Sequence, residues 1–293
     1  MDIVITYVNG LDPEWQQEYA HHTQIPLLEK RFRDWGTLRY LFRGIATYLP
    51  FIRRVHLVVA RESQVPAWIN RSQVNVVYHR DIIPAAYLPT FNSNTIEMHL
   101  HRIADLDEEY LYFNDDIFPV KMAAPTDFFR GGKAVLGMSR HLFAGGMFKK
   151  ICRNSDKMAR QALGLQPSLC FLRPQHVCAP MIKSACEQVY ERLEPAILAS
   201  LTAVRSERNL TQYLFTDYLY LQGKLLNERL SKKQFSVAVT SISRLQAFLE
   251  QPTHKLVCIN DVKLSEERYQ KMREMILRCF QEKFPNKSPF ENE

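Results

Sequence analysis

Two adjacent carboxylates, Asp115 and Asp116, follow the apolar run Tyr110–Phe113 with only Asn114 between. We expect this run to be a buried strand, and side chains that lie where a strand leaves an α/β sheet often bind ligands. Two acids placed there would be costly without a cation. Their hard oxygen ligands suit Mg²⁺ or Mn²⁺ held against a diphosphate. An Asn-Asp-Asp turn after a strand is the alternative, and it needs no ligand.

Glu97 lies near the start of a predicted helix over residues 94–104. Two structural explanations are open for its carboxylate. Asn94 as the N-cap with Glu97 three residues later would form a capping box, and Glu97 with His101 would form an i,i+4 pair on the surface. Taken alone, Glu97 is therefore predicted to have a structural role.

Asp12 follows the first predicted strand, residues 2–8, through the turn Asn9-Gly10. This arrangement places a carboxylate and backbone amides at the edge of the sheet where nucleotides often bind. The same residues are equally typical of a plain turn.

His176 lies in a loop bracketed by two prolines, and Arg205 precedes an apolar helix. A histidine titrates near neutral pH, which suits a general base, and an arginine can pair with a phosphate. The alternatives are an incidental loop histidine and a solvated surface charge.

The apolar pattern predicts strands that alternate with helices in the first half of the chain. This order indicates an α/β protein with a Rossmann-like, mostly parallel sheet flanked by helices, followed by a helical C-terminal portion. The predicted elements are strand 2–8, helix 38–49, strands 55–60 and 74–78, helix 94–104, strands 110–113 and 134–138, helices 183–200 and 207–223, strands 237–240 and 256–259, and a last helix capped by Ser265.

The composition narrows the class of partner. The 38 basic and 31 acidic residues give a net charge of +7, which suits an anionic partner such as a nucleotide, a phosphoglycan or a membrane surface. Ordinary solubility charge explains the same excess. No run of Lys and Arg interleaved with aromatic residues occurs, so nucleic acid is not an expected partner. The six cysteines form no CxxC pair, which favours reduced core thiols over a zinc site.

Four separated blocks of sequence form a wider pattern over nearly the whole chain. They are the segment 2–13; the segments 32–34, 38–40, 81–84, 88–93, 96–97, 100–103 and 112–116; the His176 loop with Arg205; and the segment 258–261 with residues 284–291. Together these blocks resemble the Stealth family of hexose-1-phosphate transferases. That family includes bacterial capsular polysaccharide phosphotransferases and the animal N-acetylglucosamine-1-phosphotransferase. Tyr7, Val262 and Cys178 depart from the family's pattern.

The resemblance implies a reaction and its partners. A hexose- or N-acetylhexosamine-1-phosphate would pass from a UDP-sugar to a glycan hydroxyl in capsular or exopolysaccharide synthesis, with release of UMP. The acceptor would be a glycan or a lipid-linked oligosaccharide. On a GT-A-like fold, residues 1–139 would form the nucleotide-sugar and metal-binding core. Residues 140–293 would supply an acceptor loop or lid and the helical portion of the same catalytic domain.

The resemblance also implies roles for single residues. His176 would be the general base, Glu97 would bind the sugar or assist the proton transfer, and Arg205 would stabilise phosphate charge. A Mg²⁺ or Mn²⁺ ion would bind to Asp115, Asp116 and Asp261, with Asp116 the preferred ligand. The binding surface for the nucleotide-sugar donor would include Tyr7, Asn9, Gly10, Asp12, Arg102 and Asn114.

Two other function classes stay open on the sequence. A metal-dependent glycosyltransferase would use the same acidic motif but would transfer the sugar alone and release UDP. A binding module for sugar nucleotides or glycans would release neither nucleotide.

The chain starts with a predicted strand rather than a signal peptide, and no apolar stretch is long enough to span a membrane. We therefore expect a bacterial cytoplasmic protein with peripheral contact to the inner face of the membrane.

Overall fold

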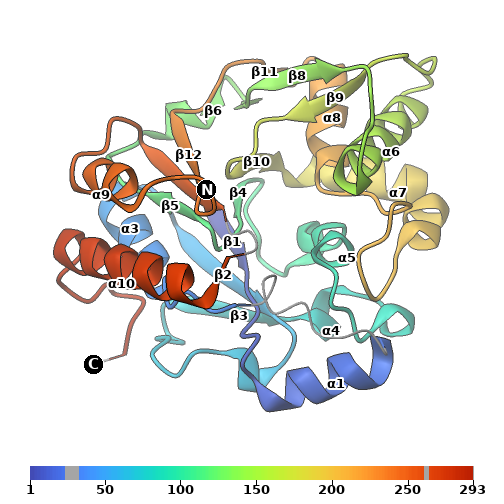
Figure 1. Cartoon of the computed structure of the whole chain (residues 1–293). Helices are drawn as coiled ribbons and strands as arrows, with labels where there is room; N and C mark the ends of the chain where they lie inside the picture. The colour runs from blue at the N-terminus through green and yellow to red at the C-terminus, as the bar shows by residue number, and fades with distance from the viewer. Residues whose placement is uncertain (24–32, 261–263, 293) are drawn as a thin grey trace. The chain divides into compact units, whose positions relative to one another are not determined.

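The largest sheet has five strands in the order β10-β4-β1-β2-β3 (Figure 1). The computed structural model describes residues 1–23, 33–260 and 264–292. The sheet is parallel apart from β10, which runs antiparallel to β4 with Ala179 opposite Tyr112. The predicted α/β fold with a mostly parallel sheet is confirmed. The five strands are β1 (Asp2–Thr6), β2 (Arg54–Val59), β3 (Val74–Tyr78), β4 (Glu109–Phe113) and β10 (Ala179–Ile182).

Continuous apolar runs explain why these segments form interior strands. The side chains of β1, β2 and β4 are nearly all buried, as expected for parallel strands that are covered on both faces. The predicted strand over residues 2–8 ends earlier, at Thr6, and the chain then leaves the sheet.

The chain divides into two compact units. Unit 1 comprises residues 1–4, 77–112 and 125–230, and unit 2 comprises residues 5–76, 113–124 and 231–293. The predicted functional division at residue 139 stays a prediction.

Unit 1 contains the helices α6, α7 and α8, the two-stranded sheet β8-β9 and the three-stranded sheet β11-β7-β6. Helix α6 packs against α8 and against β9, which pairs with β8 (Figure 1). The predicted helix over residues 94–104 is wrong, because a short helix ends at Glu97 and a separate 3-10 turn follows. The elements are α4 (His79–Ile82), α5 (Ser93–Glu97), β6 (Phe129–Arg130), β7 (Lys133–Val135), β8 (Met138–His141), α6 (Met147–Ala162), β9 (Phe171–Pro174), α7 (Lys183–Ser200), α8 (Tyr213–Leu221) and β11 (Leu225–Leu226), with 3-10 turns at Ala85–Tyr87, Leu100–Arg102 and Pro125–Asp127.

Unit 2 contains a second sheet, β12-β13-β5, and the last two helices, α9 and α10, which pack against each other. Ser265 caps α10 as predicted, since its side chain accepts a hydrogen bond from the Arg268 N–H. A buried ion pair between Arg43 and Glu291, with the Arg43 Nε 2.8 Å from a Glu291 oxygen, fixes the C-terminal segment. The elements are α1 (Pro13–Thr23), α3 (Leu38–Tyr48), a 3-10 turn (Glu62–Gln64), β5 (Ile117–Pro119), β12 (Lys232–Ser236), α9 (Ile242–Glu250), β13 (Leu256–Asn260) and α10 (Glu266–Lys283).

Candidate active site

The acidic pair lies in a tight turn of unit 2. The Ile117 N–H donates a hydrogen bond to the Asn114 carbonyl at 3.3 Å, and this closes the turn that leads into β5. Asp115 is exposed and Asp116 is half-buried. The neighbouring strand β13 fixes the second residue, because the Ile259 N–H donates to the Asp116 carbonyl at 2.9 Å. The turn that the sequence suggested is present, and it presents both carboxylates.

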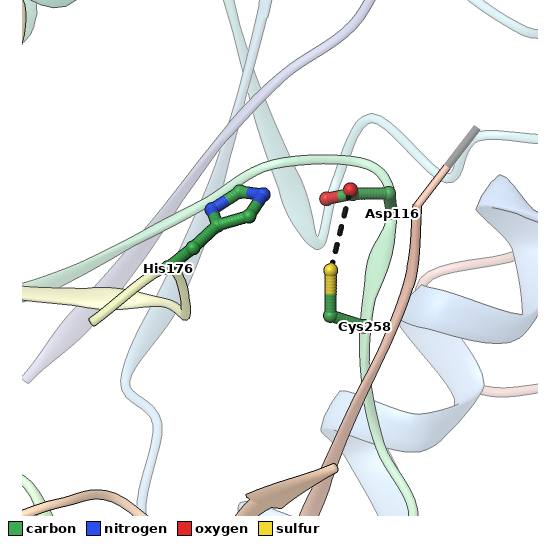
Figure 2. A group of neighbouring side chains, drawn as sticks. All are labelled: Asp116, His176 and Cys258. Carbon is green, nitrogen blue, oxygen red and sulfur yellow. Dashed lines mark hydrogen bonds between the residues drawn. The ribbon is translucent and has the colours of Figure 1, made fainter. Parts of the chain in front are cut away.

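A thiol contacts the second carboxylate. The register of β5 and β13 places Cys258 opposite Ile117, and the Cys258 Sγ donates a hydrogen bond to Asp116 Oδ2 at 3.4 Å (Figure 2). Burial, and then the charge of Asp116, raises the pKa of the Cys258 thiol well above its usual range. Cys258 therefore keeps its proton and serves as a donor to Asp116. Figure 2 also labels His176, which belongs to unit 1.

The donor chemistry of this turn fits a hard divalent cation. Carboxylate oxygens of Asp115 and Asp116 are the ligands that Mg²⁺ and Mn²⁺ prefer. A protonated thiol is a poor ligand for such an ion, so Cys258 is better suited to orienting Asp116 than to binding metal. Asp261, the third predicted ligand, lies outside the described residues.

Tyr7 interacts electrostatically with the acidic turn. Burial raises the pKa of Tyr7, and the charges of Asp34 and Asp115 raise it further. Tyr7 therefore remains a neutral phenol that can donate a hydrogen bond. Its predicted place on the donor side stays a prediction.

The loop that carries Asn9, Gly10 and Asp12 is held by Gln64. The Gln64 amide accepts from the Asn9 N–H at 2.6 Å and donates to Asp12 Oδ2, also at 2.6 Å. Asp12 also accepts hydrogen bonds from the Ser63 hydroxyl and the Glu14 N–H. Burial opposes ionisation of Asp12, but these hydrogen bonds outweigh it and lower the pKa. The contacts of Asp12 are those of a structural turn and helix cap, and nucleotide binding by this loop stays a prediction.

Glu97 is buried in unit 1, where two donors hold one of its oxygens. The Thr211 hydroxyl donates to Glu97 Oε2 at 2.7 Å, and the Gln212 N–H donates to the same atom at 3.0 Å. Burial raises the pKa of Glu97, and the hydrogen bonds from Gln212 and Thr211 and the charge of Arg205 oppose this rise. A buried carboxyl group with a raised pKa is suited to binding hydroxyl groups or moving a proton.

Both structural explanations for Glu97 are wrong. Helix α5 is capped by Asn92, whose side chain accepts from the Asn94 N–H, so Asn94 and Glu97 do not form a capping box. Glu97 is buried rather than paired with His101 on the surface. His101 instead packs on the Tyr190 ring at 4.9 Å between centroids.

A hydrogen-bonded network shapes the loop that carries Arg205. The Asn92 Nδ2 donates to Asn209 Oδ1 at 3.0 Å, and the Asn209 Nδ2 donates to the Thr202 hydroxyl at 2.8 Å. This network ties the loop to the start of α5, where the Arg205 guanidinium donates to Ser93 Oγ at 2.7 Å. Ser93 also hydrogen-bonds to Glu97. The structure therefore brings Glu97 and Arg205 together in unit 1.

The loop of His176 is fixed by the residue before it. Gln175 donates to the Leu230 carbonyl at 3.1 Å and accepts from the Leu230 N–H at 3.0 Å. His176 follows this anchor and is half-buried. Arg102 is exposed and hydrogen-bonds to the Tyr190 hydroxyl. The roles of His176 and Arg102 stay predictions.

The sequence reasoning missed the groups that position these side chains. Thr211 and Gln212 were not singled out, although a Thr just before an apolar helical run is a recognisable start signal. For Cys258 the sequence predicts a core thiol within the family segment 258–261, with no contact to Asp116. Its contact with Asp116 depends on strand register, which no local signal in the sequence revealed.

Comparisons with known proteins identify relatives of this chain. Residues 31–135 match the family region described as Stealth protein CR2, conserved region 2. The chain is 28% identical to the exopolysaccharide phosphotransferase cps2G of Lactiplantibacillus plantarum, over 99% of this chain and 96% of that protein. It is also 28% identical to the capsular polysaccharide phosphotransferase WcwK of Streptococcus pneumoniae, over 99% of each. With the capsular polysaccharide phosphotransferase fcs1 of Haemophilus influenzae it shares 31% identity, over 76% of this chain and 66% of that protein.

The chain shows only weak similarity to solved structures. A structure of LgtC aligns over 94% of this chain and 95% of its own with a TM-score of 0.38 and 14% identity, and this similarity is too low to support an argument. The sequence-based prediction of a transferase is confirmed by the relatives. Among the described residues, no helix is long and apolar enough to cross a membrane.

Proposed function

Because the chain belongs to the Stealth family, with capsular and exopolysaccharide phosphotransferases as relatives along its whole length, we propose that it transfers a sugar 1-phosphate from a UDP-sugar to a glycan hydroxyl. The sugar is a hexose or N-acetylhexosamine, and UMP is the other product. The observation that carries the proposal is that Glu97 and Arg205, both in unit 1, each hydrogen-bond to Ser93. A buried carboxyl group beside a guanidinium suits a sugar phosphate, which presents hydroxyls and negative charge together.

The reaction breaks one phosphorus–oxygen bond and forms another. The acceptor hydroxyl attacks the phosphorus that carries the sugar, its proton passes to His176, and the bond from this phosphorus to the UMP oxygen breaks. Negative charge grows on the phosphoryl oxygens and on the leaving UMP. Arg205 and Arg102 are the residues proposed to stabilise this charge.

The acidic turn is the proposed metal site. Asp116, with Asp115 and Asp261, would hold Mg²⁺ or Mn²⁺, and a bound cation of this kind neutralises diphosphate charge during phosphoryl transfer. The Cys258 thiol keeps one oxygen of Asp116 in a fixed orientation. The other oxygen of that carboxylate is the one we expect to face the ion.

The donor nucleotide is assigned to the loop after β1. Tyr7, Asn9, Gly10 and Asp12 would form one wall, and Asn114 would lie beside the diphosphate. The rigid Gln64 contacts to Asn9 and Asp12 support a preformed loop, because a loop that is already ordered loses little entropy on binding.

Analysis of the nucleotide product tests this proposal. The protein is incubated with a panel of UDP-sugars, Mg²⁺ and a glycan acceptor, and UMP and UDP are separated by ion-exchange chromatography. The proposal predicts UMP, formed only when acceptor is present. UDP as the sole nucleotide product would establish the metal-dependent glycosyltransferase instead. The Glu97→Gln variant is the matched control, and we expect it to release little of either nucleotide.

A further inference from the structure

Large apolar side chains are exposed mainly in one part of unit 1. Among the described residues, most of the exposed large apolar side chains fall between residues 142 and 169, and Phe143 and Leu169 are 78% and 87% exposed. We call the following group the apolar patch: Leu142, Phe143, Met147, Phe148 and Leu169. Soluble proteins seldom expose such groups together unless the surface binds something.

The strand register gathers this patch. Strands β8 and β9 pair antiparallel, with His141 opposite Phe171 at the end of the ladder. Leu142 and Phe143 therefore leave the ladder at the end where Leu169 enters it. Helix α6 lies beside them, because Arg153 in its second turn donates a hydrogen bond to the Leu142 carbonyl. Its first turn also lies next to β9, since the Arg173 guanidinium is 5.8 Å from the centre of the Phe148 ring. Residues distant in sequence thus form one surface.

The charge around the patch has one sign. Between Asp127 and Glu187 the sequence contains ten Lys and Arg residues and a single acid, Asp156. Asp156 is buried and paired with Arg160 at 2.9 Å, so it adds no negative charge to the surface. Arg140 and Arg153 are exposed next to the patch. Glu207, outside this segment, pairs with Lys150 at 2.8 Å. The surface charge that this segment itself contributes beside the apolar side chains is therefore positive.

We propose that the apolar patch docks the protein on an anionic lipid bilayer. Exposed Phe and Leu side chains enter the boundary between headgroups and acyl chains, while Lys and Arg remain among the phosphates. Each basic residue near such a surface adds to the attraction. A neutral glycan is a poorer match, since leucine and methionine side chains offer sugar hydroxyls no hydrogen bonds.

This inference does not depend on the proposed reaction, because lipid binding requires neither donor nor acceptor. Docking on a bilayer is nevertheless compatible with the proposed reaction. A lipid-linked acceptor would be reached from the membrane surface, and the patch belongs to the same unit as Glu97 and Arg205.

Vesicle flotation tests the inference with the full chain. The vesicles contain either phosphatidylcholine alone or one part phosphatidylglycerol to two parts phosphatidylcholine. We expect flotation with the anionic vesicles at low salt, and loss of flotation with neutral vesicles or at high salt. The double variant Phe143→Ser, Leu169→Ser should lower the partition coefficient by roughly tenfold or more, since it removes two inserting side chains. The double variant Arg140→Gln, Lys149→Gln removes one exposed and one half-buried charge of this segment. It should weaken binding and make the remaining binding less sensitive to salt.

Matched control variants distinguish binding through the apolar patch from non-specific adsorption to the vesicles. Met122→Ser with Val239→Ser removes two exposed apolar side chains from unit 2, and Lys121→Gln with Lys224→Gln removes two exposed charges elsewhere. Both controls should float like the parent protein. Absence of flotation by the parent protein, an unchanged partition coefficient in the Phe143 and Leu169 variant, or an equal loss in the controls would each overturn the proposal. Circular dichroism confirms that every variant is folded.

Discussion

Thr211 donates a 2.7 Å hydrogen bond to Glu97 Oε2, and this bond joins the start of α8 to the end of α5. The Gln212 N–H reaches the same oxygen. One oxygen of the carboxylate is therefore fixed by the protein. We expect the other to face Ser93 and the substrate, so Thr211 positions a proposed catalytic group without touching substrate itself.

Removing the Thr211 hydroxyl should change the pH dependence of turnover. Thr211→Val keeps the shape of the side chain but deletes a hydrogen bond that lowers the pKa of Glu97. The pKa should rise, the acidic limb of the kcat/KM profile should move to higher pH, and turnover at neutral pH should fall roughly tenfold. Thr211→Ser restores the donor and should restore the profile. An unchanged profile in Thr211→Val would show that this contact does not control Glu97.

The cysteines should differ sharply in reactivity. All six are free thiols, five are buried, and Cys170 is partly exposed. Burial raises the pKa of Cys152 and Cys186 to about 12, and thiols that remain protonated are poor nucleophiles. Ellman's reagent should label one thiol rapidly in the native protein and all six after denaturation. Cys170→Ser should abolish the rapid phase, and a rapid phase that persists in this variant would contradict the burial of the other thiols.

Two buried histidines should make stability depend on pH. Burial, with nearby positive charge, lowers the pKa of His101 to about 3, and burial lowers that of His99 to about 4. In the unfolded chain both should titrate near 6.5, the ordinary pKa of a histidine side chain. Below that pH the unfolded chain binds protons that the folded protein does not bind. The free energy of unfolding should therefore decrease as pH falls from 6.5 toward 4, by up to about 1.4 kcal/mol per pH unit for each histidine.

Substitution of His101 isolates its contribution to the pH dependence of the free energy of unfolding. His101 Nδ1 has no hydrogen-bond partner among the described residues, and the ring packs between Tyr190 and Phe215, so His101→Phe should be tolerated. Urea unfolding between pH 4 and pH 7 should show a slope reduced by about one proton in this variant. His22→Gln, at an exposed histidine, serves as the control. Equal slopes for His101→Phe and the parent protein would contradict a neutral, buried His101.

The sequence predicted the interior strands of the largest sheet better than the site. The predicted strand over residues 237–240 is wrong, because β12 ends at Ser236 and a turn follows. Continuous apolar runs identified β1, β2 and β4 because their burial on both faces leaves a local signal. Glu97 was misjudged because the helical spacing over residues 94–104 suggested one surface helix, whereas the helix ends at Glu97 and packing against α8 buries the carboxylate. The contacts of Glu97 with Thr211 and of Asp116 with Cys258 join distant segments. They depend on helix packing and strand register, which local propensities do not encode.

Removal of the metal should abolish turnover. If Asp116 holds the cation, EDTA should abolish turnover, and added Mg²⁺ or Mn²⁺ should restore it. Asp116→Asn should lower kcat by about a hundredfold or more, because the ion stabilises charge in the transition state. Cys258→Ala should retain more activity than Asp116→Asn, since its role is to orient the carboxylate. Full turnover in EDTA would refute the metal assignment.

The central claim is that phosphorus moves with the sugar. ³¹P NMR of the purified glycan product, made from a UDP-sugar and a phosphate-free acceptor, tests this claim most directly. The account predicts a phosphodiester resonance that couples to protons of both the transferred sugar and the acceptor. A product that carries the transferred sugar but gives no phosphorus signal would contradict it.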